Sequence, residues 1–155
     1  MDTSASIWKK YKSSRLFNEF RGTCSTKHAI LAALANEHHQ DVQLKMVICK
    51  LDQNVDKTVV KLLLQLKVPY FPEAHCYIKC SKGALDLTFP DQDVVPSVSV
   101  LKEYDISPKD IGDKKVSIHH EYIKFWMKGS MFSQQYSFDE VLELRERWIQ
   151  SLSQS

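Results

Sequence analysis

The sequence predicts an α+β fold with a mostly antiparallel sheet and with helices in both terminal parts of the chain. Apolar residues recur at helical spacing near both ends, they alternate with polar residues at 42–48, and two short apolar runs flank a turn at 81–83. Helices that precede and follow a group of strands are typical of α+β proteins with an antiparallel sheet.

Two helices are expected before the first strand. Residues 6–20 carry a broken apolar stripe, and residues 24–37 form a compact segment rich in Ala and Leu. Thr23 is a good residue to cap the second helix, and this places Cys24 in the first turn. The segment 42–48 alternates apolar and polar side chains, so it is expected to be a strand.

A third helix and three more strands are expected in the middle of the chain. The leucine-rich segment 55–67 has a helical pattern, with Asn54 or Asp56 as its cap, and the prolines that follow favour an extended chain. The strand-like segments after it are 74–80, 84–89 and 97–104. The first two of these are expected to form a hairpin around Ser81-Lys82-Gly83.

The C-terminal part of the chain, residues 105–155, is expected to be mainly helical. Ser117 can cap a helix that Gly129 ends, which places His119 at a solvated helix start. Ser137 and Glu140 form a capping box, in which the two side chains bond the unpaired amides at a helix start. The box predicts a last helix with apolar side chains on one side, namely Val141, Leu144, Trp148 and Ile149.

Length, charge and cysteine content restrict the class of protein. A chain of 155 residues with a net charge of +2 and no block of five like charges predicts one domain, residues 1–155, without nucleic acid as a partner. The N-terminus lacks the apolar stretch of a signal peptide, and no apolar run approaches the length of a membrane span. These features predict a cytoplasmic protein with no membrane partner, in which the four cysteines are reduced.

A thiol, an imidazole and a carboxylate follow one another along the chain as Cys24, His75 and Asp86. These three groups can form a nucleophile, its base and the group that orients the base. In the first turn of a helix, unpaired amides and the helix dipole favour a thiolate, so the expected position of Cys24 suits a nucleophile.

Whether His75 and Asp86 meet depends on the register of the predicted hairpin. If Cys80 pairs with Gly83, then Asp86 lies opposite Tyr77 and diagonal to His75 on the same face of the sheet. A plain three-residue turn would place the histidine and the carboxylate on opposite faces. The sequence leaves both registers open.

At these residues the chain resembles the transglutaminase-like superfamily of papain-type cysteine enzymes. That family has Gly-x-Cys at the start of a buried helix, then a His with an aromatic residue two positions later, then an Asp with a Thr two positions later. The matching segments here lie in the same order within residues 20–90, and they are Gly22-Thr23-Cys24, His75-x-Tyr77 and Asp86-x-Thr88. The resemblance implies a central helix that carries the cysteine and packs on an antiparallel sheet that bears the histidine and the aspartate.

By resemblance, Cys24 is the nucleophile, His75 the general base and acid, and Asp86 the orienting group of an enzyme that acts on amide-type bonds. Members of the family cross-link glutamine to amines, cleave peptides or remove glycans from asparagine, and some have lost the chemistry. A peptide or protein substrate is therefore implied, and no cofactor is implied. Further candidates for oxyanion or substrate binding are Asn18, Gly22 and Tyr77, the last at a position where the family usually has tryptophan.

Other interpretations of the same residues stay open. His28 follows Cys24 by one helical turn and could be the base instead, although the apolar continuation of that helix face favours a core histidine. Cys76 and Cys80 share a strand face that His75 does not, so no metal site is expected. The chain can also be a non-catalytic interaction module that keeps the fold.

Overall fold

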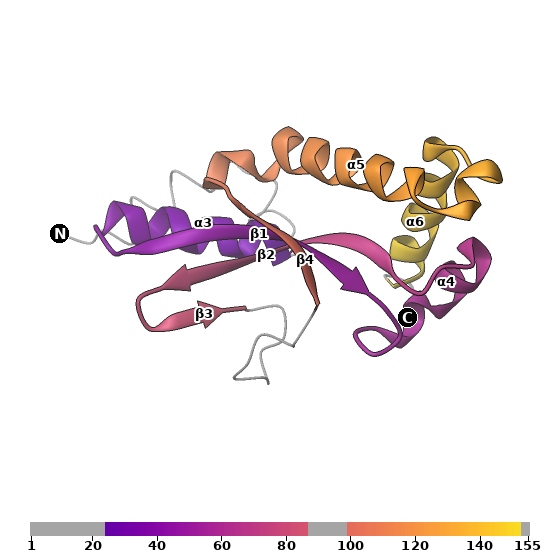
Figure 1. Ribbon diagram of the computed structural model, residues 1–155. Helices are drawn as coiled ribbons and strands as arrows, with labels where there is room; N and C mark the ends of the chain where they lie inside the picture. The colour runs from indigo at the N-terminus through magenta and orange to yellow at the C-terminus, as the bar shows by residue number, and fades with distance from the viewer. Residues whose placement is uncertain (1–23, 87–98, 153–155) are drawn as a thin grey trace. The chain divides into compact units, whose positions relative to one another are not determined.

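The computed structural model describes residues 24–86 and 99–152, and these residues have the α+β architecture that the sequence predicts (Figure 1). The described part contains four α-helices and a four-stranded antiparallel sheet in the order β3-β2-β1-β4. The helices are α3 (Cys24–Glu37), α4 (Val60–Leu66), α5 (Asp113–Lys128) and α6 (Phe138–Leu152). The strands are β1 (Val42–Leu51), β2 (Phe71–Cys80), β3 (Gly83–Leu85) and β4 (Val100–Asp105). The helix expected at 6–20 lies outside the described residues.

The described residues form two compact units, and β1, β2 and β4 each contribute residues to both. The first unit comprises residues 24–46, 75–86 and 104–113, and the second comprises residues 47–74, 99–103 and 114–152. All three residues of the predicted triad belong to the first unit. None of the helices described here is long and apolar enough to cross a membrane.

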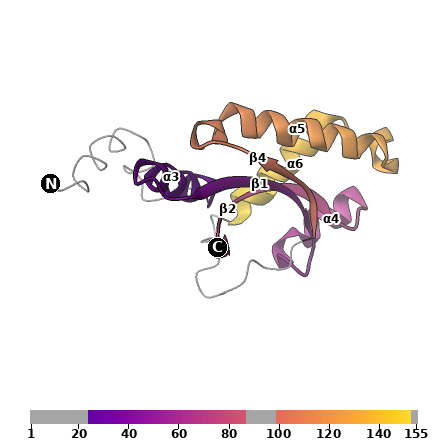
Figure 2. The ribbon, with the colours of Figure 1, turned by 60° about the vertical axis from the view of Figure 1, so that its left-hand side comes forward.

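Helix α3 buries one of its faces within the first unit. The buried residues are spaced three and four apart, as a helix face requires, and they are Ser25, His28, Ala29 and Ala32. Figures 1 and 2 both show α3 beside the start of β1, where Leu44 and Met46 are buried. The helix also packs against a short 3-10 helix, Pro108–Ile111. One face of α3 is therefore held by buried neighbours within the first unit.

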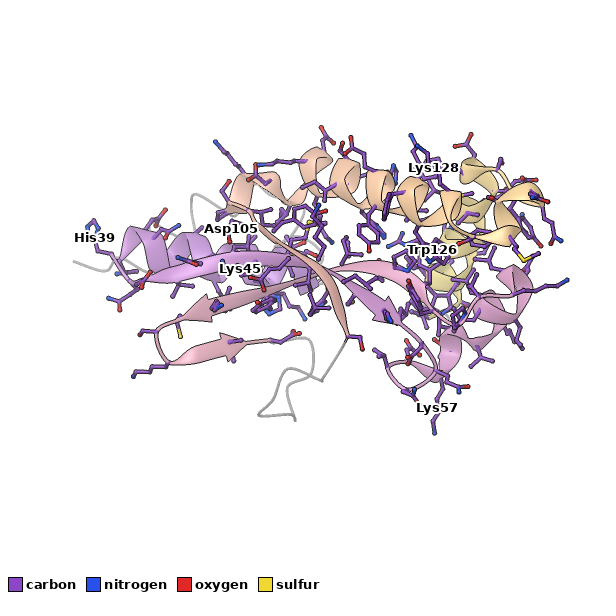
Figure 3. All side chains as sticks on the ribbon, in the orientation of Figure 1. His39, Lys45, Lys57, Asp105, Trp126 and Lys128 are labelled. Atoms are coloured by element: carbon purple, nitrogen blue, oxygen red, sulfur yellow. The ribbon has the colours of Figure 1, made fainter. Side chains whose placement is uncertain are left out.

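Strand β1 is more buried than its alternating pattern predicts. Six consecutive residues are buried, from Leu44 to Cys49, so the side chains on both faces of this part of β1 are covered. Lys45 occupies a polar position of the pattern, and its ammonium group forms an ion pair with Asp105 at the end of β4 (Figure 3). The paired carboxylate makes the burial of this lysine tolerable.

The second unit has its own hydrophobic core, formed by α4, α5, α6 and parts of β1 and β2. Its most deeply buried members are Val59, Leu66, Phe71, Ile123 and Val141. Trp126 of α5 packs at the edge of this core, where its ring centroid lies 4.9 Å from that of Phe132 (Figure 3).

Two predicted helix caps are present, and a third helix starts differently. The capping box is confirmed, since the Ser137 amide donates to Glu140 Oε2 at 2.7 Å and the Glu140 amide donates to Ser137 Oγ at 3.3 Å, just before α6 begins. The helix expected at 55–67 begins as a 3-10 turn, Lys57–Val59, and continues as α4. Of its two candidate caps, Asp56 accepts the helix amide, from Thr58 at 2.8 Å.

Helix α5 begins at Asp113, four residues before the expected cap Ser117, and it ends at Lys128, just before Gly129 as predicted. An acidic residue in the first turn interacts favourably with the helix dipole, which supports the earlier start. As a consequence, His119 lies inside the helix and is buried, not at a solvated helix start. Its Nε2 atom donates to the carbonyl oxygen of Pro72 at 2.8 Å.

Candidate active site

The β2–β3 hairpin has the register that brings His75 and Asp86 to one face of the sheet. The paired residues are Ile78 with Leu85, Lys79 with Ala84, and Cys80 with Gly83. The turn therefore consists of Ser81 and Lys82, and Gly83 follows it with φ of 130°, a conformation that other residues rarely adopt. One step further along this register, Asp86 lies opposite Tyr77 and diagonal to His75.

Asp86 contacts a histidine through each of its two carboxylate oxygens. Oδ2 lies 2.5 Å from Nε2 of His75 on β2, and Oδ1 lies 3.6 Å from Nε2 of His28 on α3. The two imidazole rings meet edge to face, with centroids 6.3 Å apart. The carboxylate therefore joins the helix that begins at Cys24 to the strand that carries His75.

Burial separates the roles of the three side chains. The side chain of Asp86 is 2% exposed and that of His28 is fully buried, whereas that of His75 is 21% exposed. Moving a carboxylate out of water costs several kcal/mol, so a buried one needs hydrogen-bond donors. Because an ionised carboxylate only accepts hydrogen bonds, the Nε2 atom of His75 carries the hydrogen in this contact.

The contact with Asp86 prepares His75 for proton transfer. With Nε2 holding a hydrogen toward the carboxylate, Nδ1 is the nitrogen that is left to accept a hydrogen bond or a proton from another group. A carboxylate in this position fixes the tautomer of the imidazole and stabilises the imidazolium that forms. The partial exposure of His75 gives the ring access to a reacting group, and the fully buried His28 has no such access.

Cys24 is the first residue of α3, as the sequence predicts, and it precedes His28 by one helical turn. Residues four apart lie on the same face of a helix, so Cys24 occupies the face from which His28 contacts Asp86. The side chain of Cys24 is outside the described part of the structure. A contact between its sulfur and the imidazole of His75 therefore stays a prediction. The candidates Asn18 and Gly22 also lie outside the described residues.

Tyr77 and His28 are placed close to the predicted triad. Tyr77 is half-buried on β2, two residues from His75 and opposite Asp86 in the hairpin register. From the sequence, His28 is expected to be a rival base or a core residue, and its contact with Asp86 was not predicted. The spacing of four between Cys24 and His28 places both residues on one helix face, but no local pattern specifies the contact with Asp86.

The described cysteines and carboxylates do not gather into a metal centre. Among the described residues there is no group of three or more histidine, cysteine or acidic side chains that could hold a metal ion. Cys76 is buried and lies on the opposite face of β2 from His75. The described thiols of Cys49, Cys76 and Cys80 are not joined in a disulfide.

Comparison of the chain with protein-family models, with curated proteins and with solved structures finds no significant match in any of the three. The function is therefore inferred from the geometry around Asp86 and the start of α3.

Proposed function

We propose that this protein is a transglutaminase-like cysteine enzyme that performs acyl transfer or hydrolysis at an amide-type bond of a peptide or protein. Cys24 is the nucleophile, His75 is the general base and acid, and Asp86 orients His75. The observation that carries the proposal is the 2.5 Å contact between Nε2 of His75 and the buried carboxylate of Asp86. The start of α3 at Cys24 supports it, because a first-turn position favours a thiolate.

The first half of the reaction forms an acyl-enzyme. The Cys24 thiol gives its proton to Nδ1 of His75, and the thiolate attacks the carbonyl carbon of the substrate amide. As the tetrahedral intermediate collapses, the carbon–nitrogen bond breaks, His75 returns the proton to the leaving amine, and a thioester to Cys24 remains.

The second half releases the acyl group. Water or a primary amine gives a proton to His75 as it attacks the thioester, and the product is a carboxylic acid or a new amide. The proton then returns to the Cys24 sulfur. The backbone amide of Cys24 is one of the first in α3, where amides have no helical acceptor, so it can donate to the oxyanion. Asn18 is the proposed second donor.

Selective alkylation tests whether Cys24 is activated. The native protein is treated with limiting iodoacetamide at mildly acidic pH, digested, and analysed by mass spectrometry. Cys24 is expected to react first. Cys80 is the internal comparison because it is half-exposed, whereas Cys49 and Cys76 are buried and should react after unfolding. Cys24 labelling no faster than that of Cys80 would contradict the proposal and favour the non-catalytic interaction module.

Variants then connect the activation to the site. His75→Ala should slow Cys24 labelling to the rate of Cys80, because the base that stabilises the thiolate is removed. Lys79→Ala is the matched control, since Lys79 is an exposed residue of the same strand. Acyl transfer itself is tested with glutamine-containing peptides and a fluorescent primary amine, with Cys24→Ala as the blank.

A further inference from the structure

His28 occupies an unusual place for a core histidine. It is fully buried on α3, its Nε2 atom lies 3.6 Å from Oδ1 of Asp86, and the other oxygen of the same carboxylate contacts His75. A purely space-filling role requires no particular orientation of the imidazole toward a carboxylate. In the structure, the Nε2 atoms of His28 and His75 instead face the two carboxylate oxygens of Asp86.

We propose that His28 is a positioning residue, whose Nε2 atom faces Oδ1 of Asp86 at 3.6 Å, a distance too long for a hydrogen bond but short enough for electrostatic attraction, so that it favours the ionised carboxylate and holds Oδ2 toward His75. His28 does not contact the substrate in this arrangement, because its side chain is fully buried. The inference rests on the proposed function only in taking the Asp86–His75 pair to be part of a catalytic site. The effect of His28 on Asp86 is a property of the two side chains, and it can be measured without any substrate.

The physical reason is the burial of Asp86. A carboxylate away from water stays ionised only when donors stabilise its charge, and each donor that is lost favours the protonated form. Protonated Asp86 would carry a hydrogen on one oxygen and could donate it to His75, which would favour the wrong tautomer of the imidazole. The imidazole of His28, on α3, disfavours the protonated form of Asp86.

The choice of substitutions separates positioning from packing. His28→Phe keeps a ring of similar size in the buried site but has no N–H group. His28→Gln places an amide N–H near the position of Nε2, so it should restore the N–H group. His28→Asn is the second variant in case the phenylalanine protein does not fold, because its shorter amide stops before that position. His38→Asn, at an exposed position just after the same helix, is the control.

The main measurement is the protonation of Asp86, followed by ¹³C NMR of its carboxyl carbon against pH. In His28→Phe and His28→Asn the midpoint should move upward by about one pH unit, and in His28→Gln it should return toward that of the wild type. His38→Asn should leave the midpoint unchanged. Equal midpoints in all of these proteins would overturn the inference.

The labelling of Cys24 distinguishes this inference from the proposed function. If the midpoint moves in His28→Phe and returns in His28→Gln while Cys24 is not activated in the wild type, the positioning role stands and the enzyme proposal fails. If Cys24 is activated in the wild type and the midpoint of Asp86 is the same in the wild type and in the His28 variants, the enzyme proposal stands and the positioning role fails. If both hold, labelling of Cys24 at mildly acidic pH should be slower in His28→Phe than in His28→Gln.

Discussion

Nε2 of His75 lies 2.5 Å from Oδ2 of Asp86, and this contact exists because the hairpin turn between β2 and β3 contains two residues. Successive side chains of a strand point to opposite faces, so a register shift of one residue would move Asp86 to the other face of the sheet. The geometry of the turn therefore decides whether the histidine and the carboxylate can meet.

Gly83→Ala is expected to destabilise the protein by about 1–2 kcal/mol, because Gly83 has φ of 130° and a Cβ atom there is strained even though no atom lies within 4 Å of it. Urea unfolding followed by circular dichroism measures the change in the free energy of unfolding. Gly129→Ala is the control, since its φ is not positive and its added Cβ would meet only a carbonyl oxygen at 3.8 Å. Equal losses in the two variants would show that the turn conformation does not matter.

Asp86→Asn is expected to keep the fold and to slow Cys24 labelling by about 10²-fold or more, because the amide cannot hold the imidazole tautomer or stabilise the imidazolium. The rate of alkylation at mildly acidic pH measures the effect, and far-UV circular dichroism checks the fold. The control is Asp105→Asn, which removes a carboxylate that pairs with Lys45 in the same unit. Unchanged labelling in Asp86→Asn would remove Asp86 from the proposed mechanism.

Local signals predicted the elements of this fold, and tertiary contacts decided the site. The capping box at Ser137 and Glu140 and the start of α3 at Cys24 depend on neighbouring residues, so the sequence was sufficient for them. The register of the hairpin was open, because the residues at 81–83 suit turns of two lengths. The contact of His28 with Asp86 joins residues 58 positions apart, so it follows from packing that no local pattern specifies.

Arg145→Ala is expected to cost about 3 kcal/mol of stability, because it leaves the partly buried carboxylate of Glu73 without its partner. Arg145 of α6 donates to both oxygens of Glu73 on β2, one of them from Nε at 2.7 Å. Burial alone would lower the pKa of Arg145, but the hydrogen bonds and the charge of Glu73 outweigh it and raise this pKa above its ordinary value.

Urea unfolding measures this loss, and the same helix supplies a matched control. Arg147 forms an ion pair with Glu143 four residues earlier, and both side chains are more than half exposed. Arg147→Ala should therefore cost no more than about 0.5 kcal/mol. A loss in Arg145→Ala as small as that in Arg147→Ala would mean that the pair with Glu73 does not stabilise the second unit.

His119 is expected to make the stability of the protein fall as the solution becomes mildly acidic. Burial lowers the pKa of His119 below its ordinary value of 6.5, and this effect outweighs the charge of Glu73 and the hydrogen bond to Pro72, which raise it. The unfolded chain therefore binds a proton at a higher pH than the folded chain does. Neutral His119 makes its full contribution to the free energy of unfolding above pH 6.5. This contribution is lost as the pH falls from there through the lower pKa of His119 in the folded state.

His119→Gln isolates this contribution, because the glutamine amide can still donate to the Pro72 carbonyl but does not titrate. The free energy of unfolding is measured by urea titration at several pH values on both sides of 6.5. Above that pH the difference between wild type and variant should be constant, and below it the wild type should lose stability relative to the variant. His38→Asn, at an exposed position, should follow the wild type. Curves for wild type and His119→Gln that stay parallel across the whole range would mean that His119 is not the titrating group.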